Sequence, residues 1–141
     1  MKTLKNMYLI LALMLVSAMS FAKDKNSAQK TLSFSVENYI QSLKSGYSEN
    51  LSEILSDQVK ININRNGKLL TYGKEQALKH NKNASNVIQN CDITQNIITQ
   101  SDNYAIVNVS MKYEHFTREN IISLTKTDRG WKITEVNSVF K

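Results

Sequence analysis

Apolar and polar residues alternate along the last third of the chain. Apolar side chains occupy every second position of the run that begins at Tyr104, as at Ala105, Val107 and Val109. Such alternation is typical of a strand with one buried face and one solvated face. We expect strands at 87–99, 104–116 and 120–127 and a last strand from Trp131, with turns at 101–103 and 128–130. The pattern predicts a long antiparallel meander.

A helical spacing of apolar residues precedes the meander. Residues 31–44 carry an apolar stripe, and Gly46 is a natural end for the helix that this stripe predicts. Ser48 is a good N-cap for a second, short helix that we expect to end at Asp57. A third short helix is predicted for residues 74–82.

Between the second and third helices the pattern predicts a hairpin. Residues 59–64 alternate apolar and polar side chains, and 69–72 form the returning strand. The turn between them contains Asn66-Gly67, which accepts the positive φ angles of a type I′ turn. Helices thus come before most strands instead of alternating with them, which predicts an α+β fold. We expect a curved sheet that wraps around the helices and encloses a pocket.

The first 22 residues have the pattern of a signal peptide. Lys2 and Lys5 precede the apolar run 7–16, which is too short to span a bilayer, and Ser20 and Ala22 supply the small residues of a cleavage site. We expect cleavage after Ala22, a periplasmic or secreted protein, and no stable membrane insertion after cleavage. An uncleaved membrane anchor is the alternative interpretation. The domain organisation then reads as signal peptide 1–22, flexible N-terminus 23–32 and one domain at 33–141.

Charge and composition exclude several classes of function. The net charge is +6, but the basic residues are scattered, so we expect no nucleic-acid partner. With four glycines the chain has no phosphate-binding loop of a known motif, and two histidines and one cysteine cannot make a standard zinc site. We therefore expect no cofactor and no metal. The lone Cys91 is interpreted as a small core residue, with an intermolecular disulfide as the alternative.

Four residues are the candidates for a ligand pocket. Tyr39, Tyr72 and Tyr113 lie on elements that should meet around one cavity, and their hydroxyl groups need partners if buried. His115 ends the expected strand 104–116 and by parity shares a face with Tyr113, so it could act as an acid, a base or a hydrogen-bond donor. The alternative is a partly exposed histidine at the end of a strand. The expected ligand is a small apolar or aromatic molecule.

The chain resembles a known superfamily in two segments and in the order of its elements. The segments are VENYIQSLKSGYSENLSEILSDQV and FTRENIISLTKTDRGWKITEVNSVF. They are similar to the nuclear-transport-factor-2-like (NTF2-like) superfamily, and most of all to its small bacterial branch called putative lumazine-binding proteins. The resemblance implies a cone-shaped fold in which a curved antiparallel sheet cups the N-terminal helices, a pocket at the open end, and frequent homodimers through the sheet.

The resemblance also allows a test for catalysis, because the superfamily includes ketosteroid-isomerase-like and polyketide-cyclase-like enzymes. Tyr39 falls where the isomerases have a hydrogen-bond donor. The position of their carboxylate base is filled by Ile63 or Asn64, and that of the second, acidic donor by Ile122 or Ser123. Neither Ile63 nor Asn64 can take a proton, and neither Ile122 nor Ser123 is an acid. We therefore expect a non-catalytic domain that binds a small molecule or assembles as a dimer. The alternative is a cyclase- or isomerase-type enzyme that uses His115 and Tyr39.

Overall fold

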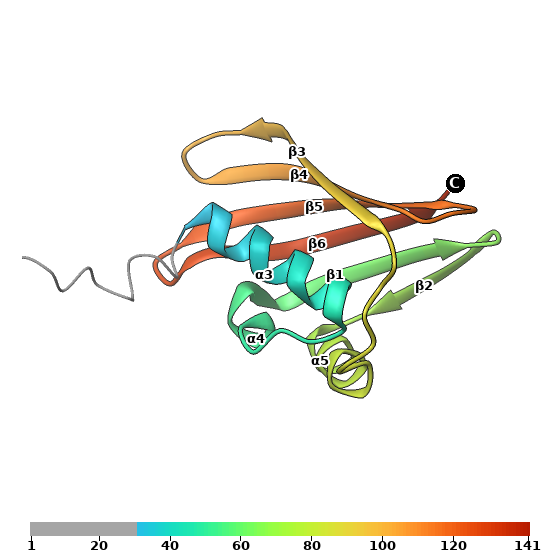
Figure 1. Cartoon of the computed structure of the whole chain (residues 1–141). Helices are drawn as coiled ribbons and strands as arrows, with labels where there is room; N and C mark the ends of the chain where they lie inside the picture. The colour runs from blue at the N-terminus through green and yellow to red at the C-terminus, as the bar shows by residue number, and fades with distance from the viewer. Residues whose placement is uncertain (1–30) are drawn as a thin grey trace, which may run out of the picture.

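A curved, open sheet wraps around helix α3 in the computed structural model, which describes residues 31–141 (Figure 1). The helices are α3 (Leu32–Ser45), α4 (Leu51–Ile54) and α5 (Lys74–Asn83). The strands are β1 (Leu55–Arg65), β2 (Lys68–Tyr72), β3 (Asp92–Gln100), β4 (Tyr104–Lys112), β5 (Thr117–Thr127) and β6 (Gly130–Phe140). The expected signal peptide lies outside the described residues, as does the expected flexible segment up to residue 30. The expected α+β class and cone-like shape are confirmed.

The sheet is mixed, not purely antiparallel as expected. Its strand order is β2-β1-β6-β5-β4-β3, and β1 runs parallel to β6 while every other neighbouring pair is antiparallel. The meander brings the last strand of the chain back beside the first, and the two strands point the same way. Local patterns define each hairpin, but they carry no information about which distant strand β1 will meet.

Helix α3 forms where the apolar stripe predicts it. The Thr31 side chain caps its start by accepting a hydrogen bond from the Phe34 backbone at 3.1 Å, and Gly46 ends it with a φ of 70°. Its buried face lies on the concave side of the sheet (Figure 1). The Ser35 hydroxyl donates to the Trp131 carbonyl at 2.7 Å, which ties the helix to β6.

The core fills the space between α3 and the concave face of the sheet. The register aligns Val107 of β4 with Ile122 of β5 and Val136 of β6, and all three side chains are buried. These residues lie at alternate positions of their strands, as the sequence pattern predicts. From the helical side Val36, Tyr39, Leu51 and Ile54 pack against them.

Several predicted strand boundaries are wrong, among them the start of β3 and the end of β4. The strand expected at 87–99 begins only at Asp92, because the preceding backbone is tied to the end of α3 by a 2.7 Å bond from Gln89 N to Lys44 O. The strand expected to reach residue 116 ends at Lys112, where a turn closed by Tyr113 N and Phe116 O at 2.9 Å leads into β5. His115 therefore lies in a turn and not at a strand end.

The second helix is also shorter than predicted. It covers only Leu51–Ile54, its N-cap is Asn50, and β1 starts directly after it at Leu55. The Ser48 hydroxyl, expected as the cap, instead donates to Asn38 Oδ1 of α3 at 3.2 Å. The side chain thus joins two elements instead of ending one.

The convex face of the sheet is largely polar. One row of paired residues crosses it from β2 to β3, and its members are Thr71, Asn62, Asn137, Ile121, Asn108 and Asn96. Asn62 donates to Asn137 at 3.0 Å and to Glu135 at 3.2 Å, and it accepts from Thr71 at 2.9 Å. The middle of the convex face is therefore a mainly polar surface.

Candidate functional site: two hollows that share Arg118

An inner cavity of about 270 Å³ lies between the C-terminal half of α3, strands β1 and β2, and helix α5. Aliphatic and aromatic side chains dominate its lining, and the polar groups among them are few. Its lining residues are Tyr39, Ser42, Leu43, Ile61, Ile63, Tyr72, Ala77, His80 and Arg118. An apolar hollow with a few polar groups is the usual form of a small-molecule site.

Two of the expected pocket tyrosines, Tyr39 and Tyr72, line this cavity. Tyr39 is almost completely buried, and burial raises its pKa to about 12, while the positive charge of Arg118 acts in the opposite direction. The Tyr39 hydroxyl therefore keeps its proton at neutral pH and can donate a hydrogen bond. The Tyr72 ring meets the His80 ring edge-on, with 5.0 Å between their centroids.

A second hollow, here called the mouth hollow, opens beside the inner cavity and has a volume of about 380 Å³. Its lining residues are Arg65, Asn66, Gln89, Tyr113, Phe116, Arg118 and Phe140. The Tyr113 and Phe116 rings are stacked at 4.4 Å between centroids, and both Arg65 and Arg118 lie over the Phe140 ring, at 5.6 Å and 5.7 Å. Aromatic faces and cations thus meet here.

Tyr113, the third expected tyrosine, belongs to the mouth hollow and not to the inner cavity. Its hydroxyl donates to Gln89 Oε1 at 2.9 Å. Burial raises the pKa of Tyr113, and the neighbouring Cys91 thiol adds to this effect. The three tyrosines therefore line two adjoining hollows, which share one residue, Arg118.

Arg118 is the charged group at the junction of the two hollows. Its Nη2 donates to the Ser138 hydroxyl at 3.2 Å, and Ser138 in turn donates to Asn120 Oδ1 at 2.6 Å. The Nε atom of Arg118 is buried and has no hydrogen-bond partner. Within residues 31–141 no carboxylate forms an ion pair with this guanidinium.

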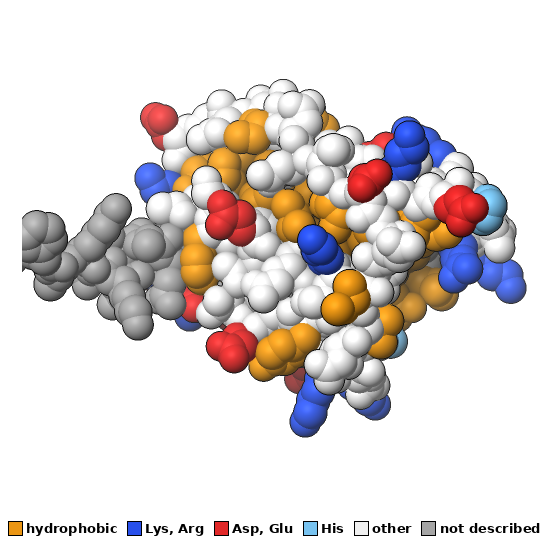
Figure 2. All heavy atoms as spheres, in the orientation of Figure 1, with side chains coloured by type: hydrophobic (Ala, Val, Ile, Leu, Met, Phe, Trp, Pro, Cys, Tyr) orange, Lys and Arg blue, Asp and Glu red, His pale blue; other side chains and the backbone are white. Residues whose placement is uncertain are grey.

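His115 lies apart from both hollows. Its side chain is 84% exposed in the β4–β5 turn, and its Nε2 lies 3.7 Å from Glu114. The expectation that it shares a face with Met111 and Tyr113 is wrong, because β4 ends at Lys112, before the alternation reaches it. Figure 2 shows basic, acidic and histidine side chains together at this end of the molecule.

The register also decides which residue occupies the base position of the isomerase relatives. Ile63 lines the inner cavity, and the exposed Asn64 lies on the opposite face of β1. Ile122 is fully buried in the core. The inner cavity therefore has an aliphatic side chain at the expected place of the carboxylate. In the described part of the chain no group of three or more His, Cys, Asp and Glu residues could hold a metal ion.

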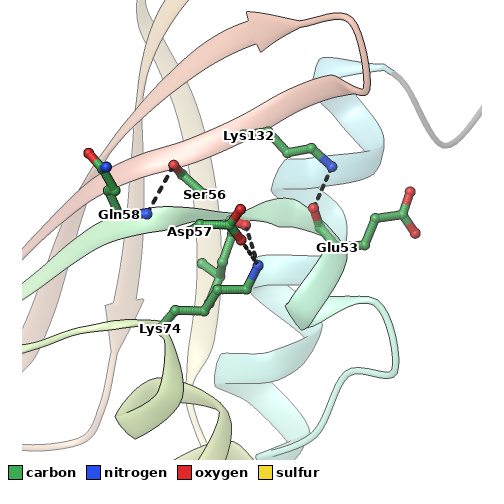
Figure 3. A network of polar contacts seen from close by, with 7 residues as sticks. Glu53, Ser56, Asp57, Gln58, Lys74 and Lys132 are labelled. Atoms are coloured by element: carbon green, nitrogen blue, oxygen red, sulfur yellow. Dashed lines mark hydrogen bonds and ion pairs between the residues drawn. The ribbon is translucent and has the colours of Figure 1, made fainter.

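A third hollow, of about 420 Å³, lies at the other end of the sheet and is more polar. Its two lysines already have partners among the protein groups (Figure 3). Lys74 pairs with Asp57 at 2.8 Å and donates to the Leu55 carbonyl at 3.1 Å, and Lys132 donates to the Glu53 carbonyl. Hydrogen bonding from Lys74 lowers the pKa of Asp57. Both lysines are thus engaged by protein oxygens, whereas no carboxylate forms an ion pair with Arg118 in the described residues.

Comparison with solved structures identifies the fold of the chain. The chain is similar to crystal structures of NTF2-like proteins of unknown function from Silicibacter pomeroyi and Methylobacillus flagellatus. The first has 15% identity and a TM-score of 0.63, over 78% of this chain and 92% of that one. The second has 21% identity and a TM-score of 0.55, over 76% of this chain and 86% of that one. A third, from Shewanella baltica, has 17% identity and a TM-score of 0.58, over 76% and 88%. At these identities the likeness shows the NTF2-like fold.

The family follows from the sequence. The family described as "Putative lumazine-binding" matches residues 27–141, and the chain belongs to that family. No curated protein matches it. The described residues contain no helix that is long and apolar enough to cross a membrane.

The sequence did not predict that three further residues line the hollows, namely Arg118, Gln89 and His80. Arg118 lies two residues before Asn120 and four before Ile122, so it occupies a core-facing position of its strand. A cation at such a position was a usable signal, but the expected strand began only at residue 120. Gln89 and His80 come from a loop and a short polar helix, where periodicity does not fix the facing of a side chain.

Proposed function

We propose that this protein binds a small molecule with an apolar or aromatic body in the inner cavity and does not transform it. The observation that carries the proposal is the lining of this cavity, in which aliphatic residues and two tyrosines surround a single cation. The volume suits a ligand of one or two rings, with the mouth hollow as its entrance. The family description supports a small-molecule ligand in general and leaves its identity open.

The geometry favours binding over the enzymatic alternative. A reaction of the isomerase or cyclase kind needs a group that takes a proton within reach of the ligand. Ile63 occupies the position of the base, and His115, the candidate acid or base, is exposed to solvent outside both hollows. Tyr39 holds its proton too firmly for a base at neutral pH, since its pKa is about 12.

We further propose that the mature protein begins at Lys23 after export and forms a homodimer through the convex face of the sheet. The sequence pattern of residues 1–22 supports export. The convex face carries polar side chains such as Asn108 and Glu119 together with apolar ones, which suits a modest and partly polar dimer contact. Half-buried Ile106 and Ile121 lie beside Asn108 and Glu119.

Filling the cavity tests the binding proposal. The neutral fluorescent probe N-phenyl-1-naphthylamine should bind to the protein, and Ala77→Phe should weaken this binding at least about tenfold because the new ring occupies the cavity. Lys79→Phe is the matched control, since it adds the same ring on the exposed side of α5 and should leave the affinity unchanged within about twofold. Fluorescence titration measures both, and circular dichroism confirms that the variants are folded.

Equal loss of affinity in the two variants, or no binding by the natural protein, would refute the inner cavity as the site.

A further inference from the structure

Arg118 is a half-buried cation with incomplete hydrogen bonding. Of its five N–H groups, the structure pairs one, from Nη2 to the Ser138 hydroxyl at 3.2 Å. The Nε atom has no contact with solvent and no partner. A buried donor without an acceptor destabilises the folded state, and more so when the group is charged. A guanidinium with free N–H groups calls for an acceptor, which water or a bound group can supply.

The neighbouring protein groups do not supply this acceptor. Glu119, the next residue, lies on the opposite face of β5, where it accepts a hydrogen bond from Ser110 at 3.2 Å. Asn120 uses its oxygen to accept from Ser138 and its amide to donate to the Val109 carbonyl at 3.1 Å. The Tyr39 phenol is neutral. In the described residues the positive charge of Arg118 thus has no negative counterpart.

Arg118 lines both the inner cavity and the mouth hollow. On one side of it lie the aliphatic wall of Ile61 and Ile63 and the ring of Tyr72. On the other side lies the aromatic group of Tyr113, Phe116 and Phe140. A ring system in either hollow can therefore place a substituent against the guanidinium.

We propose that the ligand is an organic anion with an aromatic or apolar body, and that the guanidinium of Arg118, which lines both hollows, binds its carboxylate or phosphate group. This inference rests on the proposed function, because it names the chemical class of the molecule in the same cavity. The guanidinium fork matches the geometry of carboxylate and phosphate oxygens. The Tyr39 hydroxyl lies in the same cavity and can donate a further hydrogen bond.

Three probes of the same ring system separate charge from shape. Calorimetric titration should show that naphthalene-2-carboxylate or 2-naphthyl phosphate binds at least about tenfold more tightly than neutral naphthalene-2-carboxamide. The comparison between the two anions identifies which acidic group fits. Equal affinity of all three probes would overturn the inference while N-phenyl-1-naphthylamine binding still supports the cavity. Absence of binding for that dye as well would refute the proposed function itself.

Two variants test whether Arg118 causes the preference for anionic probes over the carboxamide. Arg118→Gln should remove the preference for the anions and leave the carboxamide affinity within about twofold. Lys112→Gln is the charge-matched control, since Lys112 lies on the convex side of the adjacent strand end, and it should keep the preference. Loss of the preference in both variants would mean that only the general positive charge attracts anions, and the inference would fail.

A measurement on the natural protein covers the case in which Arg118→Gln does not fold. The Nε–H resonance of Arg118 should shift strongly when naphthalene-2-carboxylate is added and much less with the carboxamide. An Nε–H signal that responds equally to both probes, or to neither at saturating concentration, would exclude direct contact with the acidic group.

Discussion

Tyr39 has a role in the structure that its place in the sequence does not show. In the sequence it is one aromatic residue in an apolar stripe, which is most often a packing position. In the structure it is 4% exposed, lies in the core cluster and also lines the inner cavity. Its hydroxyl is therefore a polar group held in an apolar setting, and its ionisation is coupled to folding.

The alkaline stability of the protein should depend on Tyr39. Its pKa is about 12 in the folded state and 10.0 for a tyrosine side chain in water, so between these values the folded protein keeps a proton that the unfolded chain has lost. Stability that is fully present below pH 10 should therefore fall as the pH rises towards 12, by about 2–3 kcal/mol from this one group. Tyr39→Phe should remove that part of the decline.

Urea titrations at a series of pH values measure the effect on both proteins. The two curves of unfolding free energy against pH should have the same shape below about pH 9 and diverge above it. Parallel curves up to pH 12 would contradict the assignment of a raised pKa to Tyr39.

At the scale of elements, the end of α3 is fastened to the end of α5. The Asn81 side chain donates to the Gly46 carbonyl at 2.9 Å, and Gln89 N donates to Lys44 O at 2.7 Å. Gly46 has a φ of 70°, and a Cβ atom there would lie 1.9 Å from the Ala84 carbonyl oxygen. This close approach brings α5 against the inner cavity, where Ala77 and His80 form part of the lining.

Gly46→Ala should destabilise the protein more than Gly67→Ala does. Both glycines have positive φ angles, but a Cβ at Gly67 would meet nothing within 4 Å. Gly67→Ala should cost about 1–2 kcal/mol from backbone strain alone. Gly46→Ala should cost about 1–3 kcal/mol more, because the methyl group overlaps the backbone of Ala84. Chemical denaturation measures both, and equal losses would show that the two helix ends can separate at little cost.

At the scale of the whole molecule, the two faces of the sheet have different roles. The concave face packs against α3 and leaves the two hollows around Arg118. The convex face is exposed, and its polar rows include buried oxygens without partners. A dimer through the convex face would leave the inner cavity open in each copy, so assembly and ligand binding are compatible.

Native mass spectrometry of the protein purified from the producing cell tests export and assembly together. We expect a chain that begins at Lys23 and a complex of two copies, because of the signal-peptide pattern and the mixed polar and apolar surface of the convex face. A retained small molecule would be seen in the same spectrum. A chain that still contains residues 1–22 would contradict export with cleavage, and a monomer at high protein concentration would contradict the dimer.

Much of the fold could be predicted because its signals are local. The apolar stripe and Gly46 define α3, and Asn66-Gly67 defines the β1–β2 turn. The predicted start of β3 was wrong because a tertiary contact, the bond from Gln89 N to Lys44 O, holds the backbone before it, and the predicted end of β4 was wrong because a local turn closed by Tyr113 N and Phe116 O begins there. The site was predicted in part. Tyr39 and Tyr72 share one cavity and Tyr113 lies in the next, whereas His115 is exposed in a turn.

The sequence by itself determined helix α3, the turns of the hairpins and the alternation of buried and exposed positions in β4, since periodicity and turn residues act over a few neighbouring positions. Only the tertiary structure decided that β1 pairs with β6 in parallel and that Arg118 stands between two hollows without a partner for its Nε–H. Both are long-range outcomes. The strand pairing depends on how the whole meander folds back, and the state of the arginine depends on residues from several elements that approach one another only in the folded chain.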